Sequence, residues 1–274
     1  MFQALTRDIR LYMRLIAMQV KAQMQYKVDL ALDVLTYFLL TALEFATLLI
    51  YFVPFPTLLD WRMGEVALLG AVVSIGFGLA ELFGGGIDNF EVIIRQGDFD
   101  RILLRPVTAL MQVSTTQFRL RRFGRITQGL SAFGLALFFL RDAHLVWTPL
   151  KILVLCLGVL SSALIFVSVL LLGATVCFWT VETTELTNIL TYGGREMLSY
   201  PLTIYHQLLQ RLFVFIVPLA FGTYIPVCYV LGRALPFALP NWLAFFSPLI
   251  ALLFALVALA FWRFGVHRYQ STGS

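Results

Sequence analysis

The sequence is poor in charged residues for its length, and this scarcity defines its class. Of its 274 residues, 13% are charged and 60% are hydrophobic, and the mean hydropathy is +0.86. A water-soluble domain of this size could not cover so apolar a composition with polar surface, so the chain belongs in a lipid bilayer. We therefore expect an all-α integral membrane protein, because a helix satisfies its own backbone hydrogen bonds in lipid.

Lysine is scarcer still, and its scarcity excludes a nucleotide-hydrolysing site. The chain contains only Lys21, Lys27 and Lys151. A Walker A loop needs a lysine between a glycine and a Ser or Thr, where it neutralises phosphate charge, and none of the three fits. The glycine run 84–86 has no lysine after it, so we interpret it as a flexible exit from a membrane span. We expect the chain not to be an enzyme and not to hydrolyse ATP alone.

Cysteine and histidine are also few, with three of each. They lie at no spacing that would bring ligands to one metal ion. No Ser/His/Asp, Cys/His or paired-carboxylate arrangement stands out either. We therefore interpret Cys156, Cys177 and Cys228 as small core residues, and expect no metal site and no catalytic residues.

The basic residues flank apolar runs and do not cluster with exposed aromatics. The net charge of +5 is therefore better explained by orientation in a membrane than by a nucleic-acid partner, which we do not expect. Sixteen of the twenty Lys and Arg residues fall in the N-terminal helix, residues 84–125, residues 180–211 and the C-terminal residues 263–274. By the positive-inside rule these segments and both termini are cytoplasmic, in a membrane that we expect to be a bacterial inner one.

The apolar runs predict six transmembrane helices within residues 28–264, because about 20 apolar residues are needed to cross a bilayer. They are expected at about 28–53, 65–83, 126–140, 150–179, from 207 onwards, and 242–264. Pro218 and Pro226 predict that the fifth is kinked, or broken into a span and a re-entrant piece. An amphipathic cytoplasmic helix that rests on membrane lipid is predicted for residues 1–27, and a soluble cytoplasmic tail for 265–274.

Residues 84–106, between the second and third predicted spans, form the most informative polar segment, which we call the elbow. Asp88 followed three residues later by Glu91 fits a capping box at the start of a short amphipathic helix. Gly97 suits the left-handed conformation that ends such a helix, and a second short helical turn follows it. The elbow therefore predicts two short helices with an apolar ridge.

Two acidic residues lie in the first predicted span. An ionised acid well inside a bilayer costs roughly 2.5–3.5 kcal/mol on insertion scales, so Glu44 must face protein or water. Asp33 precedes Glu44 by eleven residues, about three helical turns, so both are expected on one face. That face could line a polar path or pair with an arginine on a neighbouring span, or it could be only a buried hydrogen bond.

Three motifs give the chain a resemblance to a known family. The run IRQGDFDRILLRP at 94–106 resembles the I-R-x-G-x-F-D-x-x-L-L-R-P signature of a branch of the type-2 membrane subunits of ATP-binding-cassette (ABC) exporters. Tyr200-Pro201 with the proline-containing segment after it resembles the fifth span of that branch. The closing YQSTG at 269–273 resembles its Y-x-S-x-G end.

The resemblance implies a permease with six spans that pairs with a second permease, identical or related. It also implies that a separate ATPase, which carries the ATP and Mg²⁺, drives the permease through the helix between spans two and three. Carried over, the apolar ridge would fill a groove on the ATPase and the charged residues would bond around it or brace the elbow. The expected docking residues are Phe90, Ile93, Ile94, Arg95, Asp98, Asp100, Arg101 and Arg105.

We expect spans one, two and five to line the substrate path, with Asp33 and Glu44 as candidate path residues. The small residues of span two and the aromatics of span five suggest an amphipathic or lipid-like cargo. The alternative is a secondary transporter in which Asp33 and Glu44 bind a coupling ion, and it predicts an inverted repeat of broken helices. A membrane scaffold without transport activity would explain the elbow but not the polar face of the first span.

Overall fold

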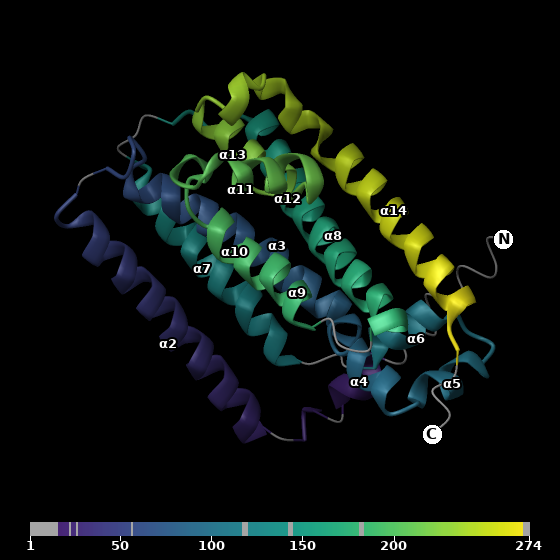
Figure 1. The fold of residues 1–274 in the computed structure, drawn as a ribbon. Helices are drawn as coiled ribbons and strands as arrows, with labels where there is room; N and C mark the ends of the chain where they lie inside the picture. Colours follow the sequence, from purple (N-terminus) through teal and green to yellow (C-terminus); the bar gives the residue numbers. More distant parts are fainter. Residues whose placement is uncertain are drawn as a thin grey trace.

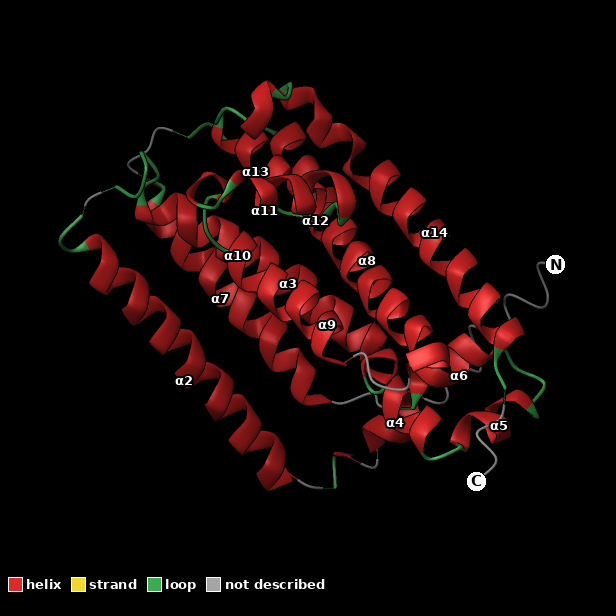
Figure 2. Ribbon diagram, viewed as in Figure 1, coloured by secondary structure: helices red, strands yellow, loops and turns green. Residues whose placement is uncertain are grey.

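The structure is a computed structural model that describes residues 16–21, 23–25, 27–55, 57–116, 120–141, 145–180 and 184–270. All regular secondary structure in these ranges is helical (Figure 2). This confirms the all-α prediction for the described part of the chain. Most of the expected interfacial helix at 1–27 lies outside the described residues, and of its length residues 16–21 are helical.

Five long helices lie alongside one another (Figure 1). They are α2 (Lys27–Phe52), α3 (Met63–Asp88), α7 (Phe123–Phe139), α8 (Pro149–Thr180) and α14 (Ser247–Arg268). Helix α3 packs against α7 on one side and α8 on the other, and α14 packs against α8. Helix α2 lies at the periphery, where it contacts mainly α7. The fold is therefore a bundle centred on α3 and α8.

Four helical stretches in the described residues are long and apolar enough to cross a membrane. They are Lys27–Phe52, Met63–Arg95, Pro149–Thr180 and Asn241–Arg268. Helix α7 has 17 residues and is about 26 Å long at 1.5 Å per residue, slightly less than a bilayer core. Of the six spans predicted from the sequence, the described residues therefore contain four helices long enough to cross a membrane.

Residues 184–198, within the segment 180–211 that the sequence predicts to be cytoplasmic, are helical and part of the bundle. Helix α9 (Thr184–Asn188) continues through a π-helical turn, Ile189–Gly193, into α10 (Gly194–Leu198). Thr191 and Leu198 in this stretch are fully buried, and α10 packs against α3. Its charged residues predicted a surface connection between spans, but Arg195 pairs with Glu44 of α2 and with Glu196.

The segment from Gln207 onwards, predicted as a kinked or broken fifth span, consists of several short helices. Helix α11 (Gln207–Arg211) and the π-helical turn Leu212–Ile216 give ten residues, about 15 Å, and the helix ends before Pro218. Two short helices follow, α12 (Leu219–Gly222) and α13 (Tyr224–Leu231). The sequence prediction of a broken segment at the two prolines is confirmed, but its position in the bundle differs.

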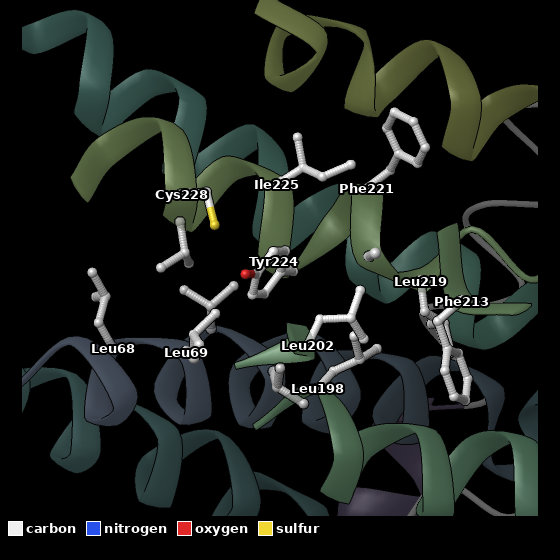
Figure 3. Close-up of a cluster of buried hydrophobic side chains, with 14 of the residues drawn as sticks. Leu68, Leu69, Leu198, Leu202, Phe213, Leu219, Phe221, Tyr224, Ile225 and Cys228 are labelled. Atoms are coloured by element: carbon white, nitrogen blue, oxygen red, sulfur yellow. The ribbon is translucent and has the colours of Figure 1, made fainter. Parts of the chain in front are cut away.

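Helices α11 to α13 lie at the end of the bundle where α3 begins, opposite the elbow (Figure 1). The rings of Trp61, just before α3, and Tyr224 have centroids 5.8 Å apart. Figure 3 shows Tyr224 and Cys228 on the same side as Leu68 and Leu69 of α3, Leu202 beside Leu198, and Leu219 beside Phe213. The short helices thus close one end of the bundle over the core.

Small residues allow the central helices to approach closely. A Cβ at Gly76 of α3 would overlap the hydroxyl of Ser162 on α8. Because lipid competes equally well for apolar side chains, membrane helices associate through such close packing and interhelical hydrogen bonds. The glycines that the sequence contributes to α3 therefore fix the position of α3 against α8 and α7.

Candidate functional site

A first ion pair lies inside the bundle, toward the elbow. Arg125 of α7 and Glu81 of α3 are 2.8 Å apart, and only 17% and 11% of their side chains are exposed. The hydroxyl of Tyr192, in the π-helical turn, donates a hydrogen bond of 3.2 Å to the same Glu81 oxygen. The pair joins three segments of the bundle. Sequence analysis missed it, although an acid inside the second apolar run is a signal for such a site.

A second polar cluster surrounds Glu44 of α2. Gln128 of α7 donates a hydrogen bond of 2.6 Å to one carboxylate oxygen, and Arg195 of α10 lies 3.2 Å from the other. Arg195 also lies 3.4 Å from Glu196. Glu44 therefore faces protein, and its partner is an arginine on another helix, one of the interpretations that the sequence left open.

Phe77 of α3 links the two clusters. The guanidinium of Arg125 lies 5.1 Å from the centroid of the Phe77 ring, and that of Arg195 lies 5.9 Å from it. Cations over an aromatic face are stabilised by the ring quadrupole, and more strongly where water is excluded. A continuous set of charged and aromatic side chains thus runs along one side of α3.

A cavity of about 240 Å³ opens next to the Glu44 cluster, between α2, α3, α7 and α10. It is partly open to the outside of the molecule. Its lining residues are Glu44, Thr47, Leu48, Ala67, Gly70, Ser74, Ala132, Arg195, Glu196, Ser199 and Tyr200. One wall is apolar and the other carries charge, so the cavity can hold a molecule with both characters.

Asp33 does not belong to this site. It is not among the residues that line the cavity, and no hydrogen bond or ion pair joins it to another described residue. Eleven residues of helix separate it from Glu44, so sharing a face of α2 does not bring the two carboxylates together. The prediction that they act as a pair is therefore not supported by the geometry.

The elbow contains α4 (Phe90–Arg95) and α5 (Asp98–Leu103), joined by Gly97 in the left-handed conformation at φ 71°. This confirms two short helices and the role of Gly97. The capping box is wrong, because Asp88 is the last residue of α3 and Glu91 pairs with Arg95 one turn later. Helix α3 continues to the elbow without the flexible exit that its glycines suggested.

An aromatic cluster fixes the elbow to the bundle. The ring of Phe90 lies 5.2 Å from Phe99 and 5.0 Å from Trp262 of α14, measured between centroids. Phe178, at the end of α8, lies 5.2 Å from Phe90. Tyr269 meets Phe99 edge to face at 5.0 Å. The elbow is thus attached to the ends of α8 and α14 as well as to α3.

This cluster corrects two of the predicted docking residues. Phe90 is completely buried and Ile94 is 2% exposed, so neither side chain can enter a groove on another protein. Ile93 is partly buried against the same cluster. The apolar ridge was predicted correctly as a ridge, but it packs on the chain's own helices. The sequence alone could not show that Phe178, Trp262 and Tyr269 cover it.

The outer side of the elbow carries the three predicted arginines, Arg95, Arg101 and Arg105. The side chains of Arg95 and Arg101 are 54% and 79% exposed, and Arg105 is also exposed. Leu104, which sequence analysis did not select, is 87% exposed, and Val92 and Leu103 are each 44% exposed. Apolar and basic side chains therefore share this surface, which we call the elbow surface: Val92, Arg95, Arg101, Leu103, Leu104 and Arg105.

The acids of α5 face inward or pair locally. Asp98 lies 3.4 Å from Arg101, a solvated pair that contributes little to stability. Burial raises the pKa of Tyr269, and a hydrogen bond to Asp100 and the negative charge of Asp100 raise it further. Asp100 therefore connects the elbow to the C-terminal segment.

Arg122 is buried against the glycines of α3. It donates hydrogen bonds of 2.8 Å to the Glu81 carbonyl and 3.4 Å to the Gly85 carbonyl. A Cβ at Gly85 would overlap its guanidinium, and a Cβ at Gly86 would overlap the carbonyl of Val113 in α6 (Ala109–Thr115). The glycine run therefore makes room for an arginine and a helix, and this close packing joins the elbow to α7.

Comparison with known proteins agrees with the resemblance given by the motifs. The family model described as ABC-2 family transporter protein matches residues 38–273, which is most of the chain. No curated protein and no solved structure matches the chain.

Proposed function

This chain belongs to the ABC-2 family, the membrane permeases of ABC transporters, and we propose that it forms one half of an exporter driven by a separate ATPase. The observation that carries the proposal is the attachment of the elbow. Its inner side is fixed to α3, α8 and α14 by the aromatic cluster, while its outer side exposes apolar and basic side chains. Force applied to the elbow surface would therefore reach three long helices at once.

We place the ATPase on the elbow surface. Leu104 and Leu103 would enter an apolar groove on the partner, and Arg95, Arg101 and Arg105 would pair with acidic groups around it. Phe90 and Ile94 have a different role, because they hold the elbow against the bundle. ATP and Mg²⁺ would bind to the partner, since the chain has no Walker A lysine.

Substitution of Leu104 by Asp tests the docking. The side chain is 87% exposed, so the change should leave the fold intact while placing a charge in the interface. We expect an ATPase subunit that co-purifies with the parent chain to be lost from Leu104→Asp. Val146, 70% exposed and at the opposite end of the bundle, supplies the matched control as Val146→Asp. Equal recovery of the ATPase with both variants would contradict the proposal.

The path would run beside α2, α3 and the α9–α10 stretch, where the cavity and the Glu44 cluster lie. A second permease, identical or related, would complete it, because one chain supplies half of such a path. The cytoplasmic side would be the elbow side. The positive-inside count changes for two residues, because Arg195 packs against the bundle and Arg211 lies at the end opposite the elbow. Most of the basic residues still lie on the elbow side, so the rule places that side in the cytoplasm. Protection of a reporter fused after Ser274 from the cytoplasm would contradict this orientation in the inner membrane.

The alternative of an ion-gradient transporter required Asp33 and Glu44 to bind one coupling ion together. Glu44 lines the cavity, whereas Asp33 lies outside it, about three helical turns away. The family and the geometry together therefore favour ATP-driven transport.

A further inference from the structure

We propose that the cavity beside Glu44 binds the cationic headgroup of an amphipathic molecule. This inference rests on the proposed transport function and names the chemical class of its cargo. Three features of the cavity favour such a ligand: the charges that face it, the hydrogen-bonding capacity of its hydroxyl groups, and its apolar wall.

The charges that face the cavity are predominantly negative. Two carboxylates, of Glu44 and Glu196, and one guanidinium, of Arg195, line it. Arg195 pairs with both acids, and 12% of its side chain is exposed. The carboxylates are much more open, with 52% and 66% of their side chains exposed. The buried cation therefore stands behind two accessible acids, and an incoming group meets a net negative charge.

The hydroxyl groups reinforce this preference. Thr47 donates its proton to the Leu43 carbonyl at 2.9 Å, and Ser199 donates its proton to the Arg195 carbonyl at 2.9 Å. Both oxygens can therefore offer only lone pairs to a ligand. The Nε atom of Arg195 is buried without a hydrogen-bond partner, but it is out of contact with the open side. Most polar atoms available in the cavity thus accept hydrogen bonds or attract positive charge.

Ser74 of α3 contributes a further polar group at the inner wall. Its side chain lines the cavity and the residue is 5% exposed, but its oxygen is not among the buried side-chain atoms that lack a hydrogen-bond partner. The hydroxyl is therefore open to the cavity, where a water or the ligand can hydrogen-bond to it.

The opposite wall accounts for the amphipathic character. Leu48, Ala67 and Ala132 line it, and Gly70 leaves open space, since nothing lies within 4 Å of where its Cβ would be. A cavity of about 240 Å³ takes a headgroup and not a whole drug-sized molecule. The remainder of the ligand would leave through the open side beside α2, whose surface is rich in exposed leucines. Tyr200 adds an aromatic ring, a surface that attracts organic cations.

Binding of radiolabelled decyltrimethylammonium tests the proposal. The full-length chain is captured on scintillation beads in dodecyl maltoside, which carries no charge, and beads without protein supply the background. Competition with unlabelled decyltrimethylammonium, decyl sulfate and decyl maltoside compares three headgroups on one alkyl chain. We expect only the cation to compete. Equal competition by decyl sulfate would overturn the proposal.

Three variants separate charge from volume. Glu44→Gln and Glu196→Gln keep the shape of the side chain and remove one charge. Each should weaken binding by about tenfold, because the Coulomb attraction between one carboxylate and a cation a few ångströms away exceeds this amount. Gly70→Leu keeps the charges and fills the cavity, and it should abolish binding. Glu185→Gln is the matched control, because Glu185 is exposed on α9, three turns before Glu196, and does not line the cavity.

The outcomes keep the inference distinct from the proposed function. Unchanged cation affinity in the two glutamate variants, or in Gly70→Leu, would overturn the binding assignment. That result would leave ATPase co-purification through Leu104 intact, so the permease proposal would stand. Unchanged ATPase co-purification in Leu104→Asp, with cation binding retained in the parent chain, would contradict the docking proposal and leave the binding assignment intact.

Discussion

Phe99 is the residue whose replacement most directly tests how the elbow is attached. It is completely buried, and its ring lies close to four other aromatic rings, those of Phe90, Phe178, Trp262 and Tyr269. Removal of a buried phenylalanine side chain typically costs about 3–5 kcal/mol, because the transfer free energy is lost and a cavity remains. Each aromatic contact contributes about 0.5–1.5 kcal/mol beyond its buried area, and these contributions are included in the total.

The elbow is in equilibrium between an attached form, in which Phe99 is buried, and a detached form, in which it is exposed. Phe99→Ala removes this stabilising free energy from the attached form only. Since about 1.4 kcal/mol corresponds to a factor of ten, the detached population should rise by about a hundredfold to a few thousandfold. Arg101 lies two residues after Phe99 and is exposed, and it is followed by Ile102, so trypsin can cleave after it once the backbone is extended. Cleavage by trypsin after Arg101 should therefore accelerate by a similar factor while reclosing is fast.

The assay follows the cleavage rate of the purified full-length chain in detergent, with the fragments identified by mass. Phe99→Leu should give an intermediate rate, because it keeps part of the buried volume. Leu104→Ala supplies the control, since Leu104 is 87% exposed and contributes little packing. If Phe99→Ala is cut no faster than Leu104→Ala, the aromatic cluster does not hold the elbow and our account of its attachment is wrong.

Two further predictions concern the bundle itself. Gly86→Ala should lower the yield of monodisperse protein in size-exclusion chromatography, because the new Cβ would overlap the Val113 carbonyl. Gly134→Ala is the control and should not lower the yield, because nothing lies within 4 Å of its Cβ position. Equal yields of the two variants would contradict the close packing of α6 on α3. Arg125→Gln should lower thermal stability strongly, by about 3–5 kcal/mol, because it leaves Glu81 buried without its charge partner, while Arg101→Gln should cost at most about 1 kcal/mol at an exposed pair. Melting of the two variants at the same temperature, followed by the loss of the monodisperse peak, would show that the buried pair is not important for stability.

The sequence allowed the long apolar helices and the two short helices of the elbow to be predicted, because period and length determine both. It also placed an apolar ridge on the elbow correctly. The direction in which that ridge faces could not be predicted. The sequence pattern of Phe90 and Ile94 is the same whether lipid, an ATPase, or α8 and α14 cover these side chains. Only the three-dimensional arrangement decides which surface covers them.

The polar site was predicted in part for the same reason. The cost of an acid in lipid required Glu44 to face protein or water, and it applied equally to Glu81, which was not selected. Arg195 could not be recognised as the partner of Glu44. Its charged neighbours made residues 180–211 resemble a surface connection, whereas in the structure Arg195 pairs with Glu44 and Glu196.

The partners of Glu44 lie 84 and 151 residues further along the chain. A polypeptide is synthesised from its N-terminus at about 5–20 residues per second, so roughly 8–30 s separate the emergence of this acid from that of Arg195. During that interval α2 must wait beside the insertion machinery or in lipid with an unpaired carboxyl group. We therefore expect the first helix to be the last to settle, and biogenesis of the protein to depend on how long the membrane tolerates it.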